Sequence, residues 1–490
     1  MYVQDTIVAP ATPPGPGAVA IVRLSGPRAF EILYTIWRPA PAARGRKLAA
    51  RRLGLGDIID PASGALVDRA LAVVMPAPAS LTGEDVAELQ CHGGIYLVRR
   101  VVALATAAGA RMAEPGEFTR RAFLNRRIDL TEAEAVADLV AARGESALKQ
   151  ALAQLTGALA ARVERMRAEV IAIRAHLEVE IDFSDEDLNL PSRHQIAGDL
   201  ERLIGHVALL HDSFARGRLM RDGARAVIAG KPNVGKSSIL NLLLGTERAI
   251  VTPIPGTTRD VIEDSIQLGP YPLVLQDTAG LRAVGADGGD SAVYGEIDIV
   301  EQIGIERTMK SLAAADLMIT VFDASRPFAG EDAEVIRLSA GRAGVAILNK
   351  SDLPAVTGAA KLRDSGLGMP ILPFSALTAE GVGELRAELT RAIETIMTMS
   401  TATIAATGSA AAGGTAASEG IAISRERHRE ALARALEALK AARHGALAMM
   451  PPEIVAVDVA AAADALGQIT GEVGAEDILD AVFREFCIGK

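Results

Sequence analysis

Residues 230–237 read GKPNVGKS, and no other segment constrains the fold of this chain as strongly. The segment fits the phosphate-loop pattern G-x-x-x-x-G-K-[ST]. The apolar run 226–229 before it predicts a short strand, and residues 238–244 after it predict a helix that stops at Gly245. Strand, glycine loop and helix are the context that this motif requires, so the sequence predicts a doubly wound α/β domain that binds a nucleotide.

The residue types of the loop suit a phosphate chain. Backbone N–H groups of such a loop converge on the β-phosphate, and the start of the following helix adds roughly half a positive charge. Lys236 is placed to reach the β- and γ-phosphates, and the hydroxyl of Ser237 to bind Mg²⁺.

Two later patterns select guanine. The predicted strand 273–276 leads into residues 277–280, a D-x-x-G motif, and the predicted strand 344–348 leads into residues 349–352, an N-K-x-D motif. In the first motif, Asp277 would hold Mg²⁺ through water and the Gly280 N–H would sense the γ-phosphate. In the second, Asp352 would accept hydrogen bonds from guanine N1–H and the exocyclic amine, which adenine does not offer on that edge.

Residues 375–377 resemble the last base-contacting loop of GTPases, which completes a GTPase set in the expected order. The predicted GTP-binding residues are Gly230, Asn233, Val234, Gly235, Lys236, Ser237, Ser238, Thr252, Pro253, Ile254, Pro255, Gly256, Thr257, Thr258, Asp277, Thr278, Ala279, Gly280, Asn349, Lys350, Asp352, Ser375, Ala376 and Leu377.

One expected catalytic group is missing. Common signalling GTPases carry Gln after D-x-x-G to orient the attacking water, whereas this chain has Leu281. An arginine finger, which supplies roughly 10³–10⁵ in rate, has local candidates in Arg259 and Arg282, although both fit a surface or phosphate-positioning role equally well. Asn233 offers another route, since its amide oxygen is placed to ligate a monovalent cation at the phosphates.

Composition narrows the class further. The chain has 490 residues, 49% of them hydrophobic, which predicts more than one domain with sizeable cores. A net charge of −10 argues against a broad basic surface for nucleic acid. Two cysteines, Cys91 and Cys487, cannot form a disulfide framework and fit a reducing, cytoplasmic location. The uncharged stretch 395–418 is built mainly of Ala, Gly, Ser and Thr, so we interpret it as a flexible linker and not a membrane span.

The periodicity outlines the rest of the chain. The first third mixes strands, such as 18–24, 71–75 and 86–90, with a helix at 95–108. A capping box at 131–134 opens a helical region that continues to about 181, and helical pattern resumes at 196–219. Three more helices are predicted at 426–447, 454–466 and 475–486. The helical region is therefore interrupted by the GTPase module, and we expect its two halves to pack together.

Several short motifs over the whole chain resemble one family. They are DTIVA at 5–9, TGED at 82–85, HGG at 92–94, PGEFT at 115–119, RAFLN at 121–125, GQITG at 467–471 and FCIGK at 486–490. Together they resemble the MnmE (TrmE) family of tRNA-modifying GTPases. The resemblance implies an α/β multidomain fold: an N-terminal α+β domain that binds folate and dimerises at 1–125, a helical domain at 126–222 and 421–490, and an inserted GTPase domain at 223–397, with the linker at 398–420.

The resemblance also implies a reaction. As a homodimer with a flavoprotein partner, MnmG, the family adds an aminomethyl or carboxymethylaminomethyl group to C5 of the wobble uridine of tRNA. The one-carbon unit comes from 5,10-methylenetetrahydrofolate, and K⁺ activates GTP hydrolysis by drawing two GTPase domains together.

Site residues carried over from the family complete the expectation. They are Asn233, Thr252, Ile254 and Thr257 for K⁺, Ser237 and Thr258 for Mg²⁺, Glu301 to orient the attacking water, Arg23, Glu88, Arg127 and Lys490 for folate, and Cys487 at the modification site. From the residues alone, Glu301 reads more simply as a solvated helix residue and Cys487 as a small buried hydrophobe. The family leaves Cys487 open between a nucleophile and a positioning residue, whereas Cys91 is expected to be a packing residue.

The chain departs from the family in a few places. Pro16 and Arg127 stand where relatives often have Arg and Lys, the segment 284–298 looks longer than usual, and residues 398–420 look inserted. A ribosome-assembly GTPase without covalent chemistry is the main competing interpretation, but it usually carries an RNA-binding module with a basic G-x-x-G loop, which we do not find. A stand-alone folate-dependent transferase is disfavoured by the complete set of GTPase motifs.

Overall fold

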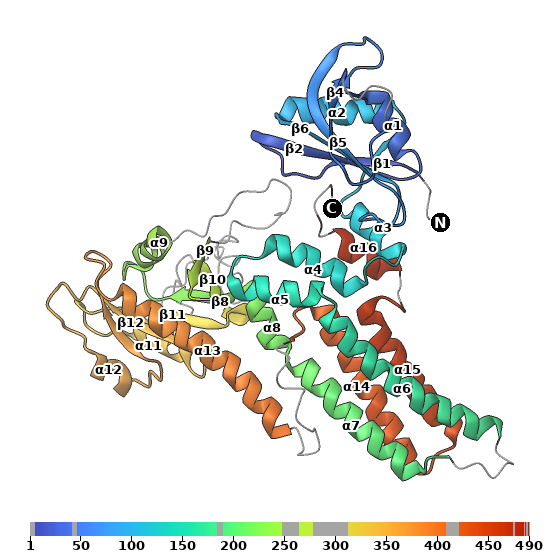
Figure 1. The fold of residues 1–490 in the computed structure, drawn as a ribbon. Coiled ribbons are helices and arrows are strands. Elements are labelled where there is room, and N and C mark those ends of the chain that lie inside the picture. Colours follow the sequence, from blue (N-terminus) through green and yellow to red (C-terminus); the bar gives the residue numbers. More distant parts are fainter. Residues whose placement is uncertain are drawn as a thin grey trace, which may run out of the picture.

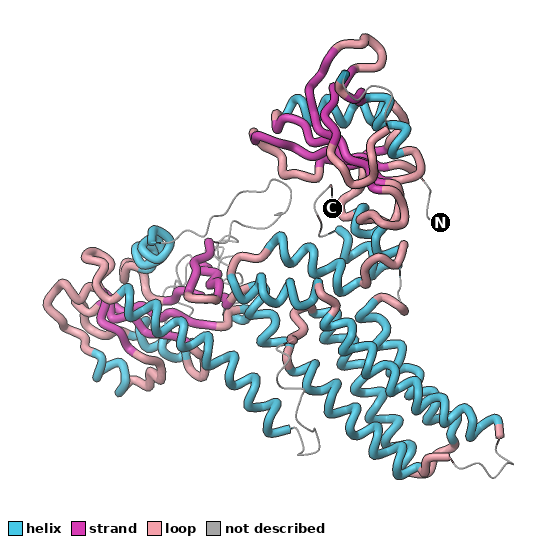
Figure 2. The backbone as a smooth tube through the Cα atoms, viewed as in Figure 1, coloured by secondary structure: helices cyan, strands magenta, loops and turns pink. Residues whose placement is uncertain are grey.

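The computed structural model describes residues 5–41, 47–183, 190–246, 264–277, 312–407, 421–473, 476–484, 486 and 489. Figure 1 shows three bodies: a strand-rich body at the top that carries the first elements, a bundle of long helices below it, and a second α/β body beside the bundle. Figure 2 shows the same division, with the strands in two separate groups and the long helices between and below them.

The N-terminal body is built on a seven-stranded sheet in the order β3-β4-β5-β6-β2-β1-β7. All neighbours in this sheet are antiparallel except β1 and β7. The elements are β1 (Ile7–Pro10), β2 (Gly17–Ser25), α1 (Ala29–Ile36), β3 (Trp37–Pro39), β4 (Gly54–Ile59), β5 (Leu66–Met75), β6 (Val86–Gly93), α2 (Ile95–Ala107) and β7 (Arg111–Met112). The predicted strands and the predicted helix at 95–108 are confirmed.

Alternation along the strands gives this sheet two different faces. On one face, Val22, Leu24 and Leu89 pack in a core with residues of α1 and α2, and Cys91 joins that core as the packing residue that the sequence predicted. On the other face, Phe118 forms a small separate cluster with residues of β1. The polar side chains at alternate positions of β2 and β6 therefore lie on the face away from the two helices.

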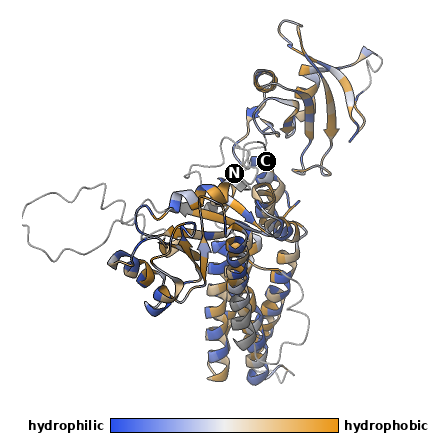
Figure 3. Ribbon diagram, turned by 90° about the vertical axis from the view of Figure 1, so that its left-hand side faces the viewer, coloured by the Kyte–Doolittle hydropathy of each residue, from blue (hydrophilic) through white to orange (hydrophobic). Residues whose placement is uncertain are grey.

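The central bundle is made from both ends of the helical sequence. Its core combines buried residues of 159–210 with buried residues of 423–469, so the prediction that two separated halves pack together is confirmed. The helices are α3 (Glu117–Leu124), α4 (Leu130–Ala141), α5 (Glu145–Leu155), α6 (Ala158–Asp182), α7 (Arg193–Asp212), α8 (Phe214–Asp222), α14 (Glu426–Leu447), α15 (Pro452–Thr470) and α16 (Glu476–Arg484). Figure 3 shows hydrophobic and hydrophilic residues interspersed along the ribbons of the bundle helices.

The predicted helical region at 131–181 is confirmed and consists of three helices, since Gly144 separates α4 from α5 and Gly157, at φ +76, separates α5 from α6. Its start differs from the prediction. The capping box lies two residues earlier than predicted: the Asp129 side chain accepts from the backbone N–H of Thr131 and Glu132, and the Glu132 side chain accepts in return from the N–H of Asp129. Because aspartate is a strong N-cap, α4 begins directly after Asp129, earlier than the sequence predicted.

The second α/β body has a six-stranded sheet in the order β13-β12-β11-β8-β10-β9, parallel throughout except for the edge strand β9. Apolar clusters cover both faces of the sheet, as a doubly wound fold requires. Its elements are β8 (Ala224–Ala229), α9 (Lys236–Thr246), β9 (Asp264–Leu268), β10 (Tyr271–Asp277), β11 (Leu317–Asp323), α11 (Gly330–Ser339), β12 (Gly344–Asn349), α12 (Ala359–Asp364), β13 (Ile371–Phe374) and α13 (Val382–Thr407). The chain thus has an α/β multidomain fold with a P-loop domain inserted into a helical domain.

The predicted start of the linker at residue 398 is wrong. Helix α13 continues to Thr407, ten residues into the stretch that we expected to be flexible, because this part carries Ala, Met and Ile and has no Gly or Pro before Gly408. Residues 408–420 lie outside the described part of the chain. None of the helices in the described ranges combines the length and the apolar character needed to cross a bilayer.

Candidate functional site

The phosphate loop lies between β8 and α9, where the sequence predicted it. Lys236 donates from Nζ to the carbonyl oxygens of Gly230 at 2.8 Å and Lys231 at 3.0 Å, so the lysine bridges the start of the loop. Gly235 has φ +102, and a Cβ there would collide with the side-chain amide of Asn349. A residue without a Cβ is therefore required at this position.

The mouth of the loop carries exposed polar side chains. Asn233, Ser237 and Ser238 are exposed, whereas Val234 is buried. Asn233 has φ +63, a left-handed backbone conformation that Asn tolerates better than most residues. The three polar side chains are consequently open to a ligand approaching the loop from solvent.

The end of β12 connects the phosphate loop to the predicted base site. The buried Asn349 donates from Nδ2 to the Val234 carbonyl at 2.7 Å, and its Oδ1 accepts from the Ala376 N–H at 3.1 Å. Asp352 Oδ1 accepts from the Ser375 hydroxyl at 2.6 Å. The structure therefore brings the predicted N-K-x-D residues and the 375–377 loop together, with Ala376 half-buried and Leu377 exposed.

Lys350 is held by a partner that the motif analysis missed. Its Nζ lies 2.5 Å from Oδ2 of the buried Asp323, at the end of β11, and Lys350 has φ +65. Burial raises the pKa of Asp323, but hydrogen bonds from Lys350 and Ser325 outweigh it and lower the pKa below its usual value. The signal available in the sequence was that Asp323 ends the apolar run 317–322, which reads as a buried strand.

Other predicted nucleotide residues are placed only in part. The backbone of Asp277 ends β10 and pairs with Ile228 of β8, beside the phosphate loop. Outside the described residues lie Thr252, Pro253, Ile254, Pro255, Gly256, Thr257, Thr258, Thr278, Ala279, Gly280 and Glu301. Within the described ranges, no group of three or more His, Cys, Asp and Glu side chains is placed to hold a metal ion.

Two of the predicted folate residues form a pair on the open face of the N-terminal sheet. Arg23 of β2 and Glu88 of β6 lie directly opposite each other, and Arg23 Nε is 2.8 Å from Glu88 Oε1. Both side chains are mostly covered, with relative exposures of 20% and 14%. The Arg23 guanidinium also lies 5.7 Å from the centroid of the Phe118 ring. The result is a half-buried ion pair with an aromatic neighbour.

The other predicted folate residues are less closely associated with this pair. Arg127 is exposed, and its Cγ would lie 3.2 Å from a Cβ on Gly83. Lys490 and Cys487 lie outside the described residues, but Gly489 is described: it is buried, with φ +100, and a Cβ on it would collide with the Pro10 carbonyl. Since Pro10 pairs with Val22 of β2, Gly489 lies close to the strand that carries Arg23.

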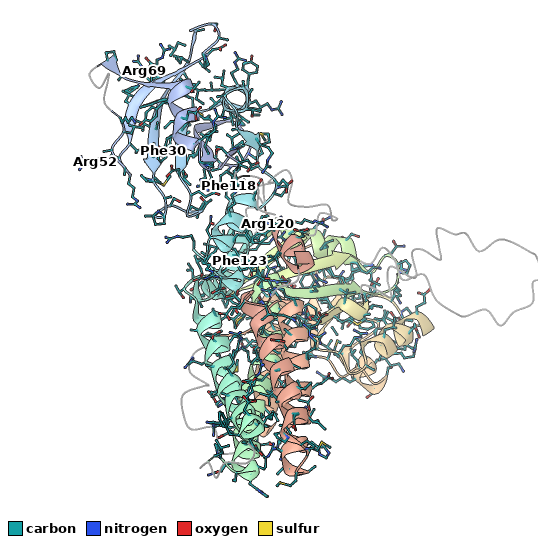
Figure 4. All side chains as sticks on the ribbon, turned by 90° about the vertical axis from the view of Figure 1, so that its right-hand side faces the viewer. Phe30, Arg52, Arg69, Phe118, Arg120 and Phe123 are labelled. Atoms are coloured by element: carbon teal, nitrogen blue, oxygen red, sulfur yellow. The ribbon has the colours of Figure 1, made fainter. Side chains whose placement is uncertain are left out.

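Helix α16 and Phe486 pack against α3 and its C-terminal end. The Phe483 ring packs 6.4 Å from Phe123 and 5.6 Å from Phe486, and Arg120 forms a 3.2 Å ion pair with Asp480. Figure 4 shows Phe118, Arg120 and Phe123 following one another down the waist between the N-terminal sheet and the helices. The C-terminal helix is therefore packed on α3, next to the sheet face that carries Arg23 and Glu88.

A buried arginine organises the same region and was not predicted. Arg121 is 1% exposed, and its side chain contacts Asp5 at 2.5 Å, Glu117 at 2.9 Å and Glu84 at 3.2 Å. Glu84 in turn accepts from the Ser25 hydroxyl at 2.6 Å, at the end of β2. The motifs TGED and RAFLN contain two of these residues, but nothing in their spacing indicated that they pair.

A second charged cluster is buried where α4 meets the start of α14. Glu134 is 1% exposed, and its oxygens accept from Arg427 at 2.5 and 2.8 Å, while His428 Nε2 lies 3.0 Å from Oε2. Burial and the charge of Arg427 lower the pKa of His428 to about 4, so the ring is neutral at neutral pH and Arg427 supplies the compensating charge. The cluster joins α4 to the chain that returns from the P-loop domain.

Comparisons with known proteins agree with this arrangement. Residues 6–127 match the model of the GTP-binding protein TrmE N-terminus, and residues 130–487 match that of the MnmE helical domain. Among solved structures, the G domain of the T. maritima FeoB iron transporter is similar, at 24% identity and a TM-score of 0.25, over 34% of this chain and 98% of its own.

Curated relatives match over their whole length. The tRNA modification GTPase MnmE of Symbiobacterium thermophilum is 44% identical over 99% of this chain and 100% of its own, and that of Heliobacterium modesticaldum is 42% identical over 100% of both. The MnmE of Chloroflexus aurantiacus is 42% identical over 99% of this chain and 100% of its own. With two family models and full-length relatives in agreement, the chain belongs to the MnmE family of tRNA modification GTPases.

Proposed function

We propose that this GTPase, with an MnmG-like flavoprotein, installs an aminomethyl or carboxymethylaminomethyl group at C5 of the wobble uridine of tRNA in the cytoplasm. The one-carbon unit comes from 5,10-methylenetetrahydrofolate. The observation that supports this best is the position of the C-terminal tail: buried Gly489 lies against Pro10, beside the strand that carries Arg23. Gly489 belongs to the segment 486–490 that the family resemblance assigns to the modification and folate sites.

GTP binding follows from the geometry of the P-loop domain. Asp352 reads the N1–H and amine edge of guanine, and the backbone of residues 230–237 surrounds the phosphates. Lys236 Nζ bridges two loop carbonyls, and it would bind the β- and γ-phosphates when a nucleotide is present. The exposed Ser237 fits a Mg²⁺ ligand because its hydroxyl is open to solvent at the first turn of α9, with Thr258 as the second protein ligand.

Hydrolysis uses a cation in place of an arginine finger. Asn233, Thr252, Ile254 and Thr257 supply the oxygen ligands for K⁺, and the exposed position and left-handed backbone of Asn233 leave its amide oxygen available for that role. Glu301 orients the attacking water, the role that Leu281 cannot fill. Two GTPase domains of the homodimer meet over the nucleotide when K⁺ is bound.

The folate site lies on the open face of the N-terminal sheet. Glu88 accepts from the amidine edge of the pterin, and a carboxylate oxygen already bound by Arg23 still has a lone pair for a second donor. Arg127 and Lys490 serve the carboxylates of the glutamate tail. When bound there, methylenetetrahydrofolate would supply the carbon, and we assign Cys487 to the modification site on the family resemblance.

We assign the domain limits according to these three functions. Residues 1–125 form the folate-binding and dimerising domain, residues 126–222 and 421–490 the helical domain, and residues 223–397 the GTPase domain. The connection back to the helical domain then comprises the end of α13 and residues up to 420.

Mass spectrometry of wobble-position nucleosides tests the proposal directly. Bulk tRNA from cells without this gene should lose the C5-substituted uridines, and wild type should restore them. Cys487→Ser should fail to restore them, whereas Cys91→Ala, which changes the buried packing cysteine, should succeed. Unchanged nucleosides in the deletion strain would overturn the proposal and leave a ribosome-assembly switch as the next function to test.

Folate binding tests the N-terminal site separately. We expect saturable binding of 5-formyltetrahydrofolate to the folded wild type, and a loss of about 1.5–3 kcal/mol of affinity in Glu88→Gln because a charged hydrogen-bond acceptor is removed. Asp57→Asn, in an exposed ion pair with Arg69 on the same sheet, is the matched control and should bind as wild type does. Equal affinity of wild type and Glu88→Gln would contradict the assignment of this face.

A further inference from the structure

The tip of the hairpin formed by β9 and β10 is one of the places where the P-loop domain contacts the helical bundle; α8 also contacts β10, and Arg218 of α8 pairs with Asp316. The Ser146 side chain, in the first turn of α5, donates from Oγ to the Pro270 carbonyl at the tip of the hairpin at 2.7 Å, and its N–H points to the same oxygen at 3.4 Å. One residue before α5 begins, a Cβ on Gly144 would lie 2.9 Å from the Gln267 amide and 3.2 Å from Pro272. The tip thus sits directly on the N-terminal turn of α5.

The open end of the same hairpin leads to the nucleotide site. Strand β9 begins at Asp264, six residues after the predicted cation loop 252–258, and β10 ends at Asp277, the first residue of D-x-x-G. Strand β10 pairs with β8, which leads into the phosphate loop. Any shift of these loops between the GDP and GTP states therefore acts on the two strands that hold the tip against α5.

The surroundings of the contact leave room for movement. Between α5, α8 and the hairpin lies a cavity of about 410 Å³, lined in part by Met220, Tyr271 and Ile421. This pocket is partly open to solvent, so the side chains that line it are not enclosed as in a core. The tip rests on α5 through the Ser146 contact, beside a cavity into which side chains have room to move.

On the bundle side, α5 is connected to the C-terminal helix. Helix α5 packs on α4, and Leu130 and Ala133 of α4 pack on Val482, Phe483 and Phe486. A displacement of α5 would therefore be transmitted through α4 to α16, from which the chain continues to Cys487. The connection from the hairpin to α16 thus consists of the Ser146 contact followed by the packed helices α5 and α4.

We infer that Ser146 is a positioning residue through which the nucleotide state of the P-loop domain changes the position of α5. The inference rests on the proposed function in one respect, because the site to which it would couple GTP hydrolysis is the proposed modification site near the C-terminus. Pro270 contributes only its carbonyl, so Ser146 carries the side-chain specificity of the contact.

Amide hydrogen exchange of the full-length protein tests the inference without any tRNA assay. The exchange of residues 145–155 is compared in GDP and in a non-hydrolysable GTP analogue. Wild type should show a nucleotide-dependent difference there. One hydrogen bond shifts an equilibrium by roughly two- to twelvefold, so Ser146→Ala should reduce this difference by a similar factor, while kcat for GTP hydrolysis stays within about twofold.

A second variant removes the contact by steric means. Gly144 has φ −162, an extended backbone that other residues adopt, so Gly144→Leu should fold and push the hairpin off α5. It should abolish the nucleotide-dependent difference. Thr156→Ala, at the other end of α5, is the matched control because the Thr156 hydroxyl bonds only to Ala153 of its own helix, and it should retain the difference.

Two results would overturn the inference. One is exchange in residues 145–155 of wild type that does not depend on the nucleotide, and the other is a full nucleotide-dependent difference in Ser146→Ala. Neither concerns wobble uridine, so failure of the proposed modification and failure of this coupling are separate outcomes.

Discussion

Asn349 Nδ2 donates a 2.7 Å hydrogen bond to the carbonyl oxygen of Val234, so a residue of the predicted base-recognition motif also holds the phosphate loop. The same side chain accepts from the Ala376 N–H at 3.1 Å. Three segments that are far apart in the sequence are thus fixed by one buried amide. The geometry of the loop consequently depends on the base site, and loss of this amide affects both.

Asn349→Ala should weaken GDP and GTP binding and lower the stability of the P-loop domain. The substitution leaves a buried carbonyl and a backbone N–H without their partner, which costs about 1–3 kcal/mol. Isothermal titration calorimetry would measure the affinity, and chemical unfolding would measure the stability. Asn241→Ala, an exposed amide on α9, is the control and should change neither. Wild-type affinity in Asn349→Ala would show that the loop holds its shape alone.

Asp352→Asn should move base preference from guanine to xanthine. The carboxylate accepts two hydrogen bonds from guanine, whereas an amide fits the carbonyl that xanthine presents at the same edge. Losing an acceptor charge costs about 1.5–3 kcal/mol, or roughly ten- to 150-fold in GDP affinity. Competition between GDP and XDP would reveal the change. Ser375 already donates to Asp352 Oδ1, so Ser375→Ala should weaken GDP binding without this reversal.

Asn233→Ala should remove the dependence of GTP hydrolysis on K⁺. If a cation replaces the arginine finger, turnover in KCl should exceed turnover in NaCl at equal ionic strength by on the order of tenfold or more. The variant should hydrolyse GTP at the low rate in both salts. Ser238→Ala changes another exposed residue near the loop and should keep the preference for K⁺. Equal wild-type rates in the two salts would exclude this mechanism.

Much of the fold could be predicted because local patterns carry it. The phosphate loop has a strand before it and a helix after it, and Asn349 follows a buried strand, so spacing alone predicted which strand ends meet. The break at Gly157 and the cap at Asp129 were missed because helical periodicity continues across them. The end of α13 was missed because an uncharged Ala- and Thr-rich stretch is compatible with both a linker and a helix.

Long-range pairs of charges were the least predictable part of the site. Arg23 and Glu88 lie opposite each other only because β2 and β6 are neighbours, which neither strand encodes. Arg121 meets Asp5, 116 residues away, by the packing of α3 beside β1. Such pairs depend on the arrangement of whole elements, and each residue in isolation looks like an ordinary surface charge.

Low pH should reduce the stability of the N-terminal domain around Arg121. Burial raises the pKa of Asp5 and of Glu117, but hydrogen bonds from Arg111 and Arg121 outweigh it, so both pKa values lie below their usual 3.8 and 4.5. A carboxyl whose pKa is lowered by folding stabilises the native state above its usual pKa, and that stabilisation is lost as the pH falls toward the lower value. The free energy of unfolding should therefore decrease below about pH 4.5.

The measurement is unfolding by urea between pH 7 and pH 3, followed by hydrogen exchange of residues 111–124. In Arg111→Ala, Asp5 and Glu117 lose a cation, their pKa values move toward the usual ones, and the acid-dependent loss in this segment should shrink. Arg69→Ala breaks an exposed ion pair elsewhere on the sheet and should leave the acid profile of wild type. If Arg111→Ala loses stability with acid as steeply as wild type, the carboxyls that pair with Arg111 are not the groups that acid titrates.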